Sequence, residues 1–177
     1  MKRRQLLGAA ALGGLALATA GVAGLPREGQ ASATGLDEAR ERLAGLRGRT
    51  LRSLSGWSPA EVFNHCAQSI EYSMDGYPQL RADWFRGSLG PLAFALFSAR
   101  GAMRHPLDEA IPGAPDLLSP AGQDAALARL EAAFERFARH RGPLQPHFAY
   151  GALSHAEYGQ AHVMHLYEHL TLIRIDG

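Results

Sequence analysis

The chain has 177 residues, with 18 basic and 17 acidic side chains, 46% hydrophobic residues and a single cysteine, Cys66. This length supports one domain with a real core. The balanced charge and the absence of a basic run after the N-terminal segment argue against nucleic acid as a partner, and one cysteine excludes an internal disulfide.

The first 33 residues are typical of an export signal. Lys2, Arg3 and Arg4 precede an apolar run over 6–23, and residues 31–33 read Ala-Ser-Ala, which fits an A-x-A cleavage site. The stretch "KRRQLL" resembles the twin-arginine signal, although the usual Ser and Phe are replaced. We expect cleavage after residue 33 and a periplasmic or other extracytoplasmic protein without membrane contact. An uncleaved membrane anchor is the alternative. Cleavage would leave 14 basic and 16 acidic side chains.

Two helices are expected at the start of the mature domain, residues 34–177. The stretch "LDEARERLAGL" (36–46) has its acids early and its arginines late, as the helix dipole favours. A second helix has Ser58 as N-cap, Pro59 in its first position and Glu61 completing a capping box. It should run to about residue 74.

The rest of the chain favours helices separated by Gly and Pro. The stretch "PLAFALFSARGAM" (91–103) is apolar but too short to span a bilayer, and a loop rich in Pro and Gly follows over 105–120. Further helices are expected over 124–140 and from a second capping box at Ser154 to about Ile173. Without a convincing strand pattern, the sequence predicts an all-α fold of four main helices and one shorter helix.

The last predicted helix carries three histidines, His162, His165 and His169. At about 100° per residue, their directions fall within about 60° of one another, beside the core-facing side. His162 and His169 are about 10 Å apart along the axis, too far to share an ion. His165 with His169, or with His162 as the alternate, is therefore the chelating pair.

His65, at the edge of the apolar face of the second helix, is the candidate third ligand, because bundles build metal sites from facing helices. Three imidazoles would leave a coordination position open for water or a small-molecule substrate. Zinc is the default metal, and nickel, iron and manganese stay open. The alternative is that each histidine is a hydrogen-bonded core or border residue.

Several other residues are weaker candidates. Glu61, one turn before His65, is a candidate base as well as a helix cap. Tyr72 and Tyr158 lie near the histidine directions and are candidates to line a pocket, with simple packing as the alternative, while Cys66 is expected to be a buried filler. Surface or capping roles are expected for the remaining histidines, His105, His140, His147 and His155.

The blocks "NHCAQSIEYSMDGYP" and "HFAYGALSHAEYGQAHVMHLYEHL" resemble the signatures of the DinB-like (YfiT-type) superfamily, in one of its uncharacterised branches. The resemblance spans residues 56–173. It implies an up-down-down-up four-helix bundle and a divalent metal, zinc or nickel, on His65, His165 and His169. Glu168 stands where related sequences often carry a further histidine.

The resemblance also implies a metal-dependent transferase of low-molecular-weight thiols, or a hydrolase, in which an open metal activates a thiolate or water. Two alternatives stay open. One is a non-catalytic periplasmic bundle that binds a metal or a small ligand, and the other is a metal-free interaction module. The sequence leaves the substrate, the metal and any homodimer undetermined.

Overall fold

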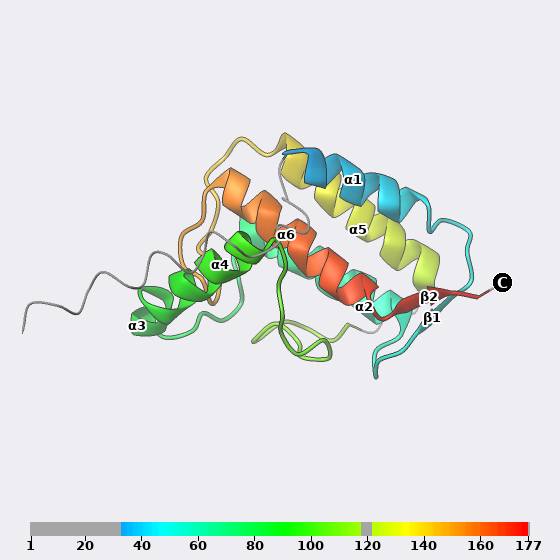
Figure 1. The fold of residues 1–177 in the computed structure, drawn as a ribbon, viewed down its shortest axis with the longest axis horizontal. Coiled ribbons are helices and arrows are strands. Elements are labelled where there is room, and N and C mark those ends of the chain that lie inside the picture. The colour runs from blue at the N-terminus through cyan, green and yellow to red at the C-terminus, as the bar shows by residue number, and fades with distance from the viewer. Residues whose placement is uncertain (1–32, 118–121, 177) are drawn as a thin grey trace, which may run out of the picture.

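The computed structural model describes residues 33–117 and 122–176 (Figure 1). Within these ranges the chain is mostly helical, as predicted. Its helices, in chain order, are α1 (Ala33–Ala44), α2 (Pro59–Asp75), α3 (Asp83–Arg86), α4 (Leu89–Arg100), α5 (Gly122–Arg139) and α6 (His155–Leu170). No helix of these ranges is both long and apolar enough to cross a bilayer. The predicted export signal lies outside the described residues except for Ala33, so it stays a prediction.

Both predicted capping boxes are present. The Ser58 hydroxyl accepts a hydrogen bond from the Glu61 amide at 3.3 Å, and the Glu61 carboxylate accepts one from the Ser58 amide at 2.7 Å. Ser154 and Glu157 repeat this arrangement at the start of α6, with distances of 3.3 and 2.8 Å. Because each box satisfies two amides that lack helical partners, it fixes the residue at which its helix begins. The starts of α2 and α6 therefore determine where along each helix axis its histidines lie.

The long helices pack in pairs around one core. α2 contacts α5 and α6, and α1 also contacts α5 and α6. α1 and α6 run in one direction, and α2 and α5 run in the other (Figure 1). The core is built from apolar side chains of all four, among them Leu43, Val62, Phe63, Ile70, Leu127, Leu130, Phe134, Phe137 and Leu166.

A short two-stranded ribbon was not predicted from the sequence. β1 (Leu51–Ser53) pairs antiparallel with β2 (Ile173–Ile175), and Ser53 lies opposite Ile173. The helix predicted to continue to Ile173 therefore ends at Leu170, because the next residues leave it to join the ribbon. A strand of three residues is too short to show the alternation of apolar and polar residues by which strands are recognised in a sequence. The ribbon ties the end of α6 to the segment that leads into α2.

Candidate metal centre

Three histidines from two helices meet at one point. His65 extends from α2, and His165 and His169 extend from adjacent turns of α6. The Nε2 atom of His165 lies 3.1 Å from Nε2 of His65 and 3.1 Å from Nε2 of His169. One ring nitrogen of each lies within 4.8 Å of those of the other two. The structure thus brings together the pair that the helical spacing indicated and the third ligand proposed from the second helix.

Burial keeps this cluster uncharged at neutral pH. Desolvation lowers the pKa of His65 to about 4 and that of His169 to about 2, and electrostatic repulsion by neighbouring histidines adds to this effect. The same causes hold the pKa of His165 well below its usual value. Neutral imidazole is the form that donates a nitrogen lone pair to a metal.

The donor set fits a divalent ion. Imidazole nitrogens bind such ions at about 2.0–2.1 Å, so neighbouring ligands stand about 3 Å apart, which matches the two separations of 3.1 Å. The Nδ1 atoms of His65 and His169 are buried and have no partner among the described residues. Metal-bound histidines usually donate that N–H to a carboxylate or carbonyl, so another contact must orient these two rings.

Trp57 supplies that contact. Its indole lies 5.0 Å from the His65 ring and is stacked on the His169 ring at 6.2 Å, with an interplanar angle of 10°. The side chain comes from the segment between β1 and α2, which the ribbon holds against the end of α6. Aromatic packing thus limits the rotation of two of the three rings.

His105 differs from its predicted surface or capping role. Its ring lies 5.0 Å from that of His165 and 5.1 Å from that of His169. Nδ1 donates to the Pro106 carbonyl at 2.7 Å, so the form of the ring with one proton has its acceptor at Nε2. That Nε2 atom is buried and has no partner among the described residues. His105 lies in a long loop without helical periodicity, so the sequence did not predict its position beside the cluster.

His162, the alternate ligand, is a core residue apart from the cluster. Its Nε2 donates to the Ser73 hydroxyl at 3.2 Å. The ring stacks on Tyr158 at 5.4 Å and meets the edge of Phe137 at 4.9 Å. The ring faces the core, where it packs on Tyr158 and Phe137, and it does not join the three clustered histidines.

The other candidates are engaged elsewhere. The Glu61 carboxylate accepts from both the amide and the hydroxyl of Ser58, and these bonds lower its pKa. Cys66 is buried as expected, and burial raises the pKa of its thiol. His140 and His155 lie at helix ends, where His155 donates to the Phe137 carbonyl in the last turn of α5 and His140 donates to the Pro143 carbonyl beyond that helix.

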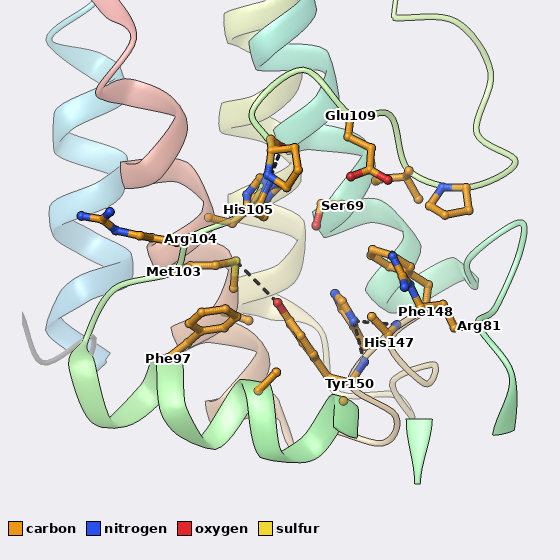
Figure 2. A pocket seen from close by; sticks show the side chains of 18 of the residues that line it. Ser69, Arg81, Phe97, Met103, Arg104, His105, Glu109, His147, Phe148 and Tyr150 are labelled. Carbon is orange, nitrogen blue, oxygen red and sulfur yellow. Dashed lines mark hydrogen bonds between the residues drawn. The ribbon is translucent and has the colours of Figure 1, made fainter. Parts of the chain in front are cut away.

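A cavity of about 350 Å³ opens beside the cluster and reaches His65 and His165 (Figure 2). Its walls are largely apolar and include Phe85, Phe97, Met103, Ile111, Phe148 and Tyr150. The two tyrosines predicted to line a pocket do not line this one. Tyr72 packs on Tyr77 at 5.7 Å, and the Tyr158 hydroxyl donates to the Gln145 carbonyl at 2.7 Å within the core.

One wall of the cavity depends on two glycines. A Cβ atom on Gly90 of α4 would lie 1.9 Å from the Ala149 carbonyl oxygen. Gly151 has a φ of +80°, and a Cβ there would lie 2.7 Å from the Arg86 carbonyl oxygen. Only glycine permits this approach and this conformation without strain. The segment over α3 and α4 therefore packs directly on the turn over 147–151.

The family model described as "Protein of unknown function (DUF1569)" matches residues 27–175. No curated protein and no solved structure matches the chain. The resemblance to the DinB-like superfamily is therefore wrong, because the model that matches belongs to a different family. The motif consists of a histidine on one helix that faces an H-x-x-x-H on another. This arrangement alone is too short a pattern to identify one family.

Proposed function

The chain belongs to the family of proteins of unknown function (DUF1569), whose model covers residues 27–175, and from the site itself we propose that it binds one divalent metal ion and uses it on a small molecule. His65, His165 and His169 would hold the ion, with zinc or nickel as the leading candidates. The observation that carries the proposal is the convergence on one point of three neutral imidazoles, of which those of His65 and His169 are buried and that of His165 is half-buried.

The proposed reaction class is hydrolysis, or transfer to a small nucleophile such as a thiol. A divalent ion held by three histidines would keep a coordination position open and make a bound water or thiol more acidic. The Nε2 atom of His105, whose ring lies beside those of His165 and His169, would take the proton of that nucleophile. The adjacent apolar cavity would hold the reaction partner and limit access of water.

We also propose that α1, α2, α5 and α6 form a four-helix bundle in up-down-down-up order, with α4 as the additional short helix. The pairwise packing and the helix directions support this arrangement. Export through the twin-arginine pathway remains part of the proposal, supported by the N-terminal sequence.

Metal binding is tested on untagged wild-type protein by elemental analysis before and after treatment with a chelator. We expect about one equivalent of zinc or nickel per chain, and reloading should raise the melting temperature. A free metal concentration of 100 times Kd should add about 2.7 kcal/mol to the free energy of unfolding. Failure of the metal-free protein to take up zinc, nickel, iron or manganese would exclude a metal function.

The reaction is tested separately, with loaded protein and panels of esters and of thiols with electrophiles. Turnover that disappears with chelation and returns with metal would support the enzyme. Stoichiometric metal without turnover would favour a carrier instead.

Replacing Trp57 by Ala is expected to weaken zinc binding about 10-fold, the lower end of the cost of losing an outer contact that orients metal ligands. The reason is that the rings of His65 and His169 lose the indole that packs on both. Competition with a chromophoric chelator measures the affinity.

Trp84→Ala is the matched control. The chain has two tryptophans, and Trp84 is 67% exposed on α3. Its removal should leave zinc affinity unchanged. Equal affinities for both variants would show that Trp57 does not orient the ligands.

A further inference from the structure

His147 differs from its predicted surface or capping role, since it is only 7% exposed. It lies in the turn that ends at Gly151, and the backbones of these two residues pair with each other. Its Nδ1 atom accepts hydrogen bonds from the backbone amides of Ala149 and Tyr150, both at 3.1 Å. A nitrogen that accepts cannot carry the proton, so the neutral ring carries it at Nε2.

Packing fixes the orientation of the His147 ring and keeps the ring uncharged. The imidazole stacks on Tyr150 at 4.2 Å, with an interplanar angle of 6°, and Tyr77 meets it at 5.1 Å. Burial lowers the pKa of His147 to about 3. The side chain is therefore a neutral N–H donor whose tautomer and direction are set by the turn.

The donor faces the cavity. Figure 2 shows one ring nitrogen of His147 bonded to the turn and the other pointing into the open space. Nε2 has no hydrogen-bond partner among residues 33–117 and 122–176. The cavity walls are mainly apolar, but Ser69, Arg81, Arg104 and Glu109 line them as well, so the Nε2–H group is one of several polar groups that a ligand would meet. Leaving such a donor unsatisfied beneath a bound apolar molecule is costly.

We propose that the Nε2–H group of His147 is the polar anchor of this cavity, and that its ligand is a small, mainly apolar molecule with a carbonyl oxygen. A neutral N–H donor binds an acceptor such as a carbonyl oxygen, and the apolar part of the walls favours a ligand that is otherwise apolar. The volume of 350 Å³ equals that of about twelve waters at about 30 Å³ each, which suits a compact molecule. The anchor acts in binding and does not depend on a metal.

Two isosteric probes test this. The probe 4-phenylbutan-2-one carries a carbonyl oxygen, and isopentylbenzene carries a methyl group in its place. Wild-type protein should bind the ketone about 10-fold more tightly than the hydrocarbon, because only the ketone satisfies the buried donor. Ligand-observed NMR measures both affinities, in chelator-treated and in zinc-loaded protein.

His147→Asn should remove this preference. An asparagine Oδ1 can still accept from the two amides of the turn, but its Nδ2 takes the place of Cδ2 and does not reach the position of Nε2. His140→Asn, at the end of α5, should keep the preference and serves as the control. Absence of ketone binding to the wild type, equal binding of the two probes, or a preference that survives in His147→Asn overturns the proposal.

A readout without ligand covers the case in which His147→Asn fails to fold. Long-range ¹H–¹⁵N spectra of the wild type should show His147 protonated at Nε2 and not at Nδ1, unchanged between pH 8 and 5. A proton at Nδ1, or titration near pH 6.5, overturns the anchor. These results are independent of metal content, so failure of the metal proposal and failure of the anchor can be told apart.

Discussion

Replacing His165 by Gln is expected to lower zinc affinity by more than about 100-fold, since loss of an outer contact alone costs 10–100-fold. His165 is the central member of the cluster, because its Nε2 lies 3.1 Å from the Nε2 atoms of both His65 and His169. Without it, only two ligands from different helices remain. Isothermal titration of the metal-free protein with zinc measures the change, and elemental analysis gives the stoichiometry.

His140→Gln is the matched control for this substitution. His140 lies at the C-terminal end of α5, where its Nε2 donates to the Pro143 carbonyl at 3.3 Å. Zinc affinity and stoichiometry should match those of the wild type. If His165→Gln is unfolded by circular dichroism, His65→Gln provides the same test from α2. Retention of wild-type affinity in a folded variant of either position would rule out the three-histidine centre.

Phe137→Ala is expected to destabilise the protein by about 3–5 kcal/mol, the usual cost of truncating a buried phenylalanine. The ring is fully buried on α5. It stacks on His155 at 4.3 Å and contacts the edge of His162 at 4.9 Å, so its loss leaves a cavity between α5 and α6. Urea denaturation of metal-free protein measures the free energy of unfolding.

Trp84→Ala controls for the loss of an aromatic ring outside the core. Trp84 is 67% exposed, and surface substitutions usually change stability by no more than about 0.5 kcal/mol. A loss of less than about 1 kcal/mol for Phe137→Ala would contradict the close packing of the Phe137 ring against His155 and His162 of α6. The zinc affinity of the folded Phe137→Ala protein should stay near that of the wild type, because Phe137 contacts none of the three ligands.

Local patterns predicted the frame of the metal centre. The capping boxes at Ser58 and Ser154 fixed where α2 and α6 begin, because a cap involves only residues within one turn. The spacing of His165 and His169 put both imidazoles on one face by helix geometry alone. His65 followed from the apolar edge of its own helix.

The short sequence blocks did not predict the family of the chain or the contacts of individual side chains. They suggested the wrong family, and the whole-length match over residues 27–175 corrected it. Tyr72 and Tyr158 have suitable helical directions, but a direction does not say which space a side chain enters. Tyr158 points into the core, where its hydroxyl donates to Gln145.

By itself the sequence determined the long helices, the starts of α2 and α6 and the pair His165 and His169, since these depend on interactions between residues close along the chain. Only the tertiary structure decided that His105 lies against the cluster, that Trp57 orients two of its rings and that His147 directs its N–H into a cavity. Each of these positions lies in a loop or turn. Such segments lack a hydrophobic period, and their direction is set by the helices on which they pack.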